Sequence, residues 1–96
     1  MDISKEITGN SAVIRLDGWL DTQSAPAFKT ALDELGEGVT ELTLDLGKLE
    51  YISSAGLRLV VAANKQMNGA MTITGASVEI LDLFRMTGFD KRLKIE

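Results

Sequence analysis

The sequence contains no histidine and no cysteine. Catalytic triads and general bases built on histidine, thiol nucleophiles, zinc sites of cysteine or histidine, and disulfide bonds are therefore excluded by the inventory of side chains. Many enzyme classes depend on one of these missing side chains. We accordingly expect a chain that is not an enzyme, with no catalytic residue, no metal site and no cofactor.

Long apolar runs and an excess of positive charge are also missing. No stretch approaches the roughly 20 apolar residues that span a bilayer, and the first residues lack the basic and apolar regions of a signal peptide. We therefore expect a cytoplasmic protein that does not insert into membranes. The formal net charge is −4, with 10 basic against 14 acidic residues, which disfavours nucleic acid as a partner because its phosphates attract basic surfaces.

Length and composition are those of one small folded domain. Apolar residues make up 45% of the chain, charged residues 25%, and there is one proline, a composition typical of globular rather than disordered proteins. A chain of 96 residues builds a modest core with little room for a buried catalytic cleft. No repeat or linker divides it, so we expect a single domain over residues 1–96.

Hydrophobic periodicity places the secondary structure. Alternation at residues 3–7 and 12–16 on either side of Gly9-Asn10 predicts an antiparallel hairpin. Strands then alternate with helices, which predicts parallel pairing in the centre of a mixed α/β sheet. Thr22 or Ser24 is the expected cap of the first helix, and Phe28 lies on its buried stripe. We expect helices at 22–35, 54–68 and 77–87, strands at 39–46 and 71–74, and an extended segment at 89–95.

A serine pair stands where the central strand meets the second helix. The junction reads Ser53-Ser54-Ala55-Gly56-Leu57. A helix start offers unpaired N–H groups and a positive dipole end, both of which favour a phosphate on an accessible hydroxyl. A serine at this place is more often a plain N-cap worth about 1 kcal/mol, and the pattern alone favours that role.

Three segments together carry a family resemblance. They are residues 44–67, LDLGKLEYISSAGLRLVVAANKQM; residues 18–21, GWLD, followed by Ala25-Pro26; and residues 86–90, MTGFD. Their order and spacing resemble those of STAS domains, the fold of anti-sigma factor antagonists, over nearly the whole chain. The resemblance implies a mixed sheet with an N-terminal antiparallel hairpin and helices packed mainly on one face.

The resemblance also implies roles for residues at the serine pair. In antagonists of this family the phosphoacceptor is the serine two positions before the motif's glycine, which here is Ser54, while Ser53 is the expected cap or orienting neighbour. Close antagonists usually carry Asp where this chain has Ser53, and Ser or Thr where it has Ala55. A partner-binding surface is expected around the start of the second helix, formed by Trp19, Asp21, Ser53, Ala55, Gly56 and Arg58.

Two of these residues, and Asp45 in the preceding strand, leave alternatives open. Trp19 shares its strand parity with outward-facing residues, so it is either an exposed binding anchor or is folded back onto the core at Gly18. Asp21 orients a hydroxyl or contacts the partner, or it only interacts with a helix dipole. Asp45 is either a solvated charge or a support for the loop before Ser53.

The function implied is a regulatory switch in transcription. The unphosphorylated chain would bind an anti-sigma factor that is also a serine kinase and so free a sigma factor, and phosphorylation of Ser54 would end the binding until a serine phosphatase restored it. Such a partner-switching phosphoprotein is expected to be a monomer or weak dimer. The alternative is an adaptor without a phosphate cycle, a subunit of a lipid-transport ATPase or of a stress-sensing complex. A nucleotide sensor is disfavoured because no P-loop spacing is present.

Overall fold

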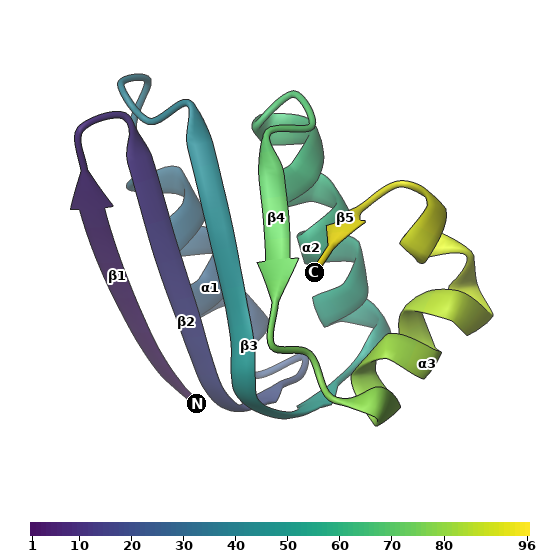
Figure 1. The fold of residues 1–96 in the computed structure, drawn as a ribbon. Coiled ribbons are helices and arrows are strands. Elements are labelled where there is room, and N and C mark those ends of the chain that lie inside the picture. Colours follow the sequence, from purple (N-terminus) through teal and green to yellow (C-terminus); the bar gives the residue numbers. More distant parts are fainter.

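The computed structural model describes residues 1–96 and contains three α-helices, one short 3₁₀ helix and five strands (Figure 1). The predicted order of two strands followed by alternating helices and strands is confirmed, and one short strand is added at the end. The elements are β1 (Asp2–Thr8), β2 (Ser11–Leu20), α1 (Ala25–Asp33), β3 (Glu41–Ile52), α2 (Ser54–Gln66), β4 (Met71–Thr74), α3 (Val78–Thr87), the 3₁₀ helix η1 (Phe89–Lys91) and β5 (Lys94–Ile95).

The strands form one mixed sheet in the order β1-β2-β3-β4-β5. β1 and β2 pair antiparallel, with Thr8 opposite Ser11 across the turn, where Gly9 takes a φ of +61°. The pairs β2 with β3, β3 with β4, and β4 with β5 are parallel. The antiparallel edge and the parallel centre are both as predicted from the sequence.

The hydrophobic core lies between the sheet and the helices, which cover one face of the sheet (Figure 1). Ile14 of β2 and Leu44 of β3 face this layer and are fully buried, as are Phe28 of α1, Val60 of α2 and Phe84 of α3. Each such side chain stabilises the fold by roughly 1.5–3 kcal/mol through its removal from water. The core therefore fixes where the helices, and with them their N-termini, lie against the strand ends.

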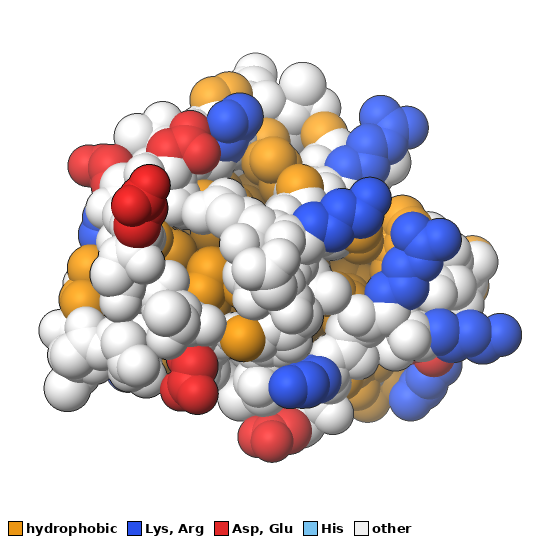
Figure 2. Space-filling view, turned by 90° about the horizontal axis from the view of Figure 1, so that it is seen from above, with side chains coloured by type: hydrophobic (Ala, Val, Ile, Leu, Met, Phe, Trp, Pro, Cys, Tyr) orange, Lys and Arg blue, Asp and Glu red, His pale blue; other side chains and the backbone are white.

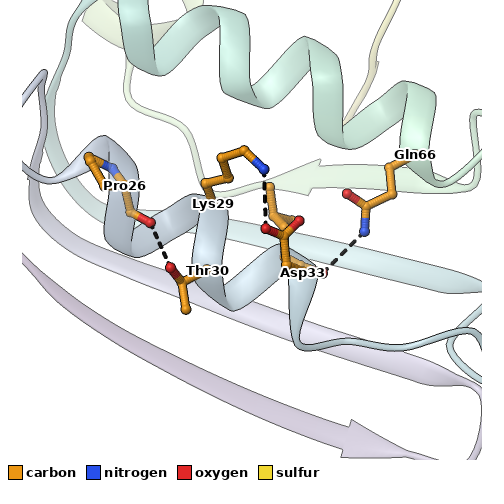
Figure 3. Close-up of polar contacts among 6 residues, drawn as sticks. Pro26, Lys29, Thr30, Asp33 and Gln66 are labelled. Carbon is orange, nitrogen blue, oxygen red and sulfur yellow. Dashed lines mark hydrogen bonds and ion pairs between the residues drawn. The ribbon is translucent and has the colours of Figure 1, made fainter.

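The helices α1 and α2 are also joined by a polar contact near their C-terminal ends (Figure 3). The side-chain amide of Gln66 donates to the carbonyl oxygen of Leu32 at 3.1 Å. Within α1, the ammonium group of Lys29 lies 3.1 Å from the Asp33 carboxylate, one helical turn away. An exposed pair of this kind contributes only about 0.2–0.5 kcal/mol, so packing rather than charge holds the two helices together.

The opposite face of the sheet is polar. Arg15 lies in β2 with its Nε 3.5 Å from Asp45 Oδ2 and its Nη1 3.7 Å from Glu6 Oε1. These pairs are open to solvent and contribute about 0–1 kcal/mol each. One wet and one dry face explain the alternation of polar and apolar residues along β2 and the first half of β3.

Charge is unevenly spread over the molecule. Viewed from above, lysine and arginine side chains gather on the side where α3 and β5 lie, and most visible aspartate and glutamate side chains lie toward the other side (Figure 2). Lys91, Arg92 and Lys94 near the C-terminus are exposed. None of the helices has the length and apolar character needed to cross a membrane.

Several predicted boundaries differ from the structure by a residue or two, and three predictions are wrong by more. α1 begins at Ala25 rather than at residue 22, because residues 21–24 form a hydrogen-bonded turn. β3 continues beyond Leu46 to Ile52 through two irregularities in its pairing with β2. The segment 89–95 is not extended throughout: residues 89–91 form a 3₁₀ helix, and only Lys94–Ile95 pairs with β4.

Candidate functional site

The carboxyl ends of β2 and β3 meet at one edge of the sheet, because the two strands are parallel. β2 ends at Leu20 and β3 at Ile52, and these two residues are partners in the register. The backbone N–H of Ser53 donates to the Leu20 carbonyl oxygen at 2.8 Å, which ties the start of α2 to the end of β2. The helices α1 and α2 both begin close to this edge (Figure 1). Topology thus brings the GWLD segment and the serine pair together.

Ser53 caps α2, as the sequence predicts. Its backbone is extended, with φ −85° and ψ 172°, and its Oγ accepts a hydrogen bond from the Gly56 N–H at 3.2 Å. The side chain is half-buried and its oxygen satisfies one of the free donors of the first turn. Ser53 is therefore committed to the fold.

Ser54 is the first residue of α2 and is exposed. The first turn of α2 contains no acidic side chain, so nothing on the helix neutralises the positive end of its dipole. An anion on the Ser54 oxygen would lie beside that end of a 13-residue helix. Because Ser54 is exposed, a group attached to its oxygen would displace no buried side chain.

Gly56 allows α2 to approach the strands closely. A Cβ at this position would lie 2.8 Å from Leu20 Cγ, 2.9 Å from Ile52 Cγ1 and 2.9 Å from the Leu20 carbonyl oxygen. The residue is buried, so its contribution to any docking surface is to set the place of the helix start. No larger residue fits without moving α2 away from the sheet.

Asp21 organises the turn that leads into α1. Its Oδ1 accepts the backbone N–H groups of Gln23 and Ser24, each at 3.0 Å, and lies 3.0 Å from Ser24 Oγ. The backbone and side-chain hydrogen bonds from Ser24 lower the pKa of the Asp21 carboxyl, because they stabilise its charged form. The Ser24 hydroxyl also bonds the Trp19 carbonyl oxygen at 2.7 Å and makes no cap bond to α1.

The remaining predicted residues are Arg58, Ala55 and Asp45. Arg58 is exposed one turn after Ser54, and Ala55 is half-buried beside it. Asp45 pairs with Arg15 and accepts the Gly47 N–H at 2.9 Å, so it supports its own strand rather than the loop before Ser53. No group of three or more acidic side chains is placed to hold a metal ion.

Trp19 is exposed, and it has partners that the sequence analysis missed. Its indole ring lies 5.3 Å from the ring of Tyr51, centroid to centroid, at an interplanar angle of 47°. Its Nε1 donates to Glu50 Oε2 at 3.3 Å. The signal that was overlooked is the break in alternation at residues 49–52, where Glu50 and Tyr51 are both exposed between the buried Leu49 and Ile52.

Comparison with known families agrees with this arrangement. Residues 3–96 match the family model described as "Mlab, STAS domain". The chain belongs to the STAS domain family. The putative anti-sigma factor antagonist BtrV of Bordetella bronchiseptica is 32% identical over 78 residues, which cover 77% of this STAS domain and 67% of BtrV. The sequence relation therefore extends to antagonists, which are regulatory binding proteins rather than enzymes.

Solved structures show the same fold at lower identity. An anti-sigma factor antagonist from Mycobacterium paratuberculosis superposes with a TM-score of 0.88 at 21% identity, covering 98% of this STAS domain and 83% of that chain. SpoIIAA in its unphosphorylated form gives 0.84 at 19% identity, with 99% and 88% covered. Bacillus SpoIIAA in the phosphorylated form gives 0.69 at 21%, with 99% and 91% covered. The predicted STAS-like α/β fold is thereby confirmed.

Proposed function

We propose that this STAS domain is an anti-sigma factor antagonist whose binding is controlled by phosphorylation of Ser54. In the unphosphorylated form it binds a cytoplasmic anti-sigma factor that is also a serine kinase, and this binding releases a sigma factor. The observation that carries the proposal is the exposed hydroxyl of Ser54 at the first residue of α2. Its relation to antagonists such as BtrV supports the choice of partner.

The proposed docking surface is the edge where the strand ends meet the first turn of α2. Exposed Trp19 and Arg58 are available for direct contact, whereas Ser53 and Gly56 hold the start of the helix against the strands. Asp21 fixes the backbone just before α1. The surface comprises Trp19, Asp21, Ser53, Ser54, Ala55, Gly56 and Arg58.

The covalent step belongs to the partner's chemistry. The Ser54 oxygen attacks the γ-phosphorus of the kinase's ATP, a new oxygen–phosphorus bond forms, the bond to ADP breaks, and the hydroxyl proton leaves to a base of the kinase. A separate serine phosphatase reverses the change: water attacks phosphorus, the bond between phosphorus and the Ser54 oxygen breaks, that oxygen takes up a proton, and inorganic phosphate departs. This STAS domain is the substrate and the ligand in both directions.

Phosphorylation stops binding through charge rather than refolding. It adds about −1.5 to −2 charge at neutral pH to a side chain that is exposed and outside the core. The N–H groups at the start of α2 accommodate this charge within the domain. A partner packed over the same spot would have to desolvate the phosphate and tolerate its repulsion, so the complex dissociates while the fold remains.

Incubation with ATP, magnesium and each serine-kinase anti-sigma factor of the source organism tests the proposal. Intact-mass and peptide analysis should find one phosphate on the peptide that contains Ser54. Ser54→Ala should abolish it, and the matched control Ser53→Ala should retain it. Ser54→Asp should weaken binding to the same kinase at least tenfold, whereas Ser54→Ala should bind within about threefold of the wild type.

The adaptor alternative gives a different result. A subunit of a lipid-transport ATPase or a stress-sensing complex needs no phosphate cycle. In that case no kinase phosphorylates the chain, and Ser54→Asp leaves association with the cognate assembly unchanged. Phosphate that persists in Ser54→Ala would contradict the proposed site.

A further inference from the structure

Trp19 and Tyr51 form an aromatic pair on the surface rather than in the core. Trp19 is 57% exposed and Tyr51 is 44% exposed. The phenylalanines behave differently, since Phe28 and Phe84 are fully buried and Phe89 is half-buried. Single exposed apolar side chains are ordinary, but two adjoining exposed rings form a continuous apolar area that the rest of the domain does not cover.

A bulge in β3 creates this pair. Between the register pairs Gly18–Leu49 and Trp19–Tyr51, β3 contains one more residue than β2, and that extra residue is Glu50. Bulges redirect side chains, and here both Glu50 and Tyr51 reach the surface beside Trp19. The next register pair, Leu20 with Ile52, leads directly to Ser53, so the aromatic pair is continuous with the proposed docking surface.

The carboxylate of Glu50 adds a negative charge and hydrogen-bond acceptors beside the aromatic pair. Its Oε2 accepts the indole N–H of Trp19 at 3.3 Å, which satisfies the single polar group of the indole and leaves the ring faces apolar. Other lone pairs of the carboxylate remain open to solvent, because Glu50 is exposed and forms no ion pair. Asp17 lies two residues before Trp19 on the same exposed parity, while Lys48 is the register partner of Asp17.

We propose that Trp19, Tyr51 and Glu50 form a receptor for one arginine side chain of the protein partner. The inference rests on the proposed function, because it takes that partner to be the one that covers Ser54. A guanidinium is planar. Its flat face stacks on aromatic rings, while its N–H groups, which point outward in its own plane, donate to a carboxylate, so it satisfies both parts of the site.

Other occupants fit the site less well. A purely apolar side chain would bury the Glu50 carboxylate without a hydrogen-bond partner, which is costly. An acidic side chain would be repelled by Glu50 and Asp17. A lysine ammonium would reach the carboxylate but lacks the flat surface that stacks on the indole.

Direct titration of the isolated ¹⁵N-labelled domain tests the chemistry without any partner protein. The chain has one tryptophan, so the indole N–H gives a single resonance that reports on Trp19 alone. N-acetyl-arginine amide should shift this resonance saturably, at a concentration at least fivefold lower than N-acetyl-leucine amide requires. Glu50→Gln should reduce the difference between the two, because the charged acceptor is lost while the aromatic rings remain. Equal shifts from both amides, or no shift from the arginine amide, would overturn the proposal.

Variants then test the site against the kinase of the proposed function. Trp19→Ala should weaken binding by about tenfold or more, as loss of an interface anchor does, and Glu50→Gln by roughly three- to tenfold. Matched controls lie elsewhere on the surface: Glu37→Gln removes an exposed carboxylate in the loop before β3, and Met86→Ala removes an exposed apolar side chain of α3. Both controls should bind like the wild type. Circular dichroism verifies that each variant is folded.

The outcomes separate this inference from the proposed function. If Ser54→Asp weakens the complex while Trp19→Ala and Glu50→Gln do not, the antagonist function holds and the arginine receptor is refuted. If the arginine amide binds at Trp19 in the free domain but no kinase phosphorylates Ser54, the receptor is supported as a binding site and the phosphorylation switch is refuted.

Discussion

Replacing Gly56 with alanine tests how closely α2 must approach the strands. The added Cβ would stand 2.8 to 2.9 Å from Leu20 Cγ, Ile52 Cγ1 and the Leu20 carbonyl oxygen. A side chain can shift by changing rotamer, but this carbonyl cannot move freely because it accepts the Ser53 N–H at 2.8 Å. The start of α2 must therefore move outward, and the contacts of Leu57 and Val60 with the core move with it.

The magnitude follows from two opposing effects. Overpacking of a close contact costs typically 1–3 kcal/mol. Alanine in place of glycine inside a helix contributes about 1 kcal/mol in the other direction, and Gly56 is the third residue of α2. We expect the steric cost to prevail because one of the three clashing atoms belongs to the backbone, and we expect Gly56→Ala to lower the free energy of unfolding by about 1–2 kcal/mol.

Urea denaturation measures this difference. The fluorescence of the single tryptophan and far-ultraviolet circular dichroism provide two independent probes of unfolding. The matched control is Gly38→Ala, where a Cβ meets nothing within 4 Å and φ lies outside the left-handed region. This control should be neutral or more stable by up to about 1 kcal/mol. Equal or greater stability of Gly56→Ala than of the wild type would refute the close-packing argument.

Further substitutions test the helix cap, the Asp21 turn and the core. Ser53→Ala should cost about 1 kcal/mol in urea denaturation, and Ser53→Asp should retain most of that stability because aspartate is also a good cap. The pKa of Asp21 is lowered by folding, so its stabilising effect is present above the ordinary value of 3.8 and is lost as pH falls through the folded-state pKa. The difference in urea midpoint between wild type and Asp21→Ala should therefore shrink below pH 3.8, and a constant difference down to pH 2 would contradict this. Phe84→Ala should lower the free energy of unfolding by about 3–5 kcal/mol, since the ring is fully buried.

Much of the fold was predictable because most segments follow one period. The stripe that contains Phe28 and Leu32 recurs at helical spacing, and the alternation around Ile14 and Leu44 is that of strands with one buried face. Each pattern is local, and in the structure the same residues of each segment face the core as the pattern predicts. The order of elements and the antiparallel start of the sheet followed from these patterns.

In β3 the prediction failed because extra residues change the phase of the alternation. Leu46-Gly47-Lys48 resembles the end of a strand, yet β3 continues because bulges let it follow the twist of β2. Each inserted residue turns the following side chains to the other face, so Leu49 is buried and Glu50 exposed against the simple alternation, and the second insertion returns Tyr51 and Ile52 to the original phase. The break in alternation at residues 49–52 marks the irregular part of β3, but alternation along one strand does not give the register with β2, and the pair of Trp19 with Tyr51 was missed for that reason.

The site was predicted in part. The cap at Ser53 and the exposed Ser54 followed from the junction of strand and helix. The structural role of Asp21 did not, because its turn is fixed by hydrogen bonds to Ser24 and through Ser24 to the Trp19 carbonyl, none of which has a periodic signature. These contacts can be predicted only when the chain direction after β2 is known.

Calorimetric titration of the kinase partner tests the central claim most directly. Two preparations of this STAS domain are compared, one with Ser54 unmodified and one with phosphoserine incorporated at position 54 during synthesis, so that no kinase reaction is needed to make it. We predict that the unmodified domain binds and that the phosphorylated domain, equally folded by circular dichroism, binds at least tenfold more weakly. Equal affinity of the two preparations would contradict the claim that the Ser54 hydroxyl lies at the docking surface.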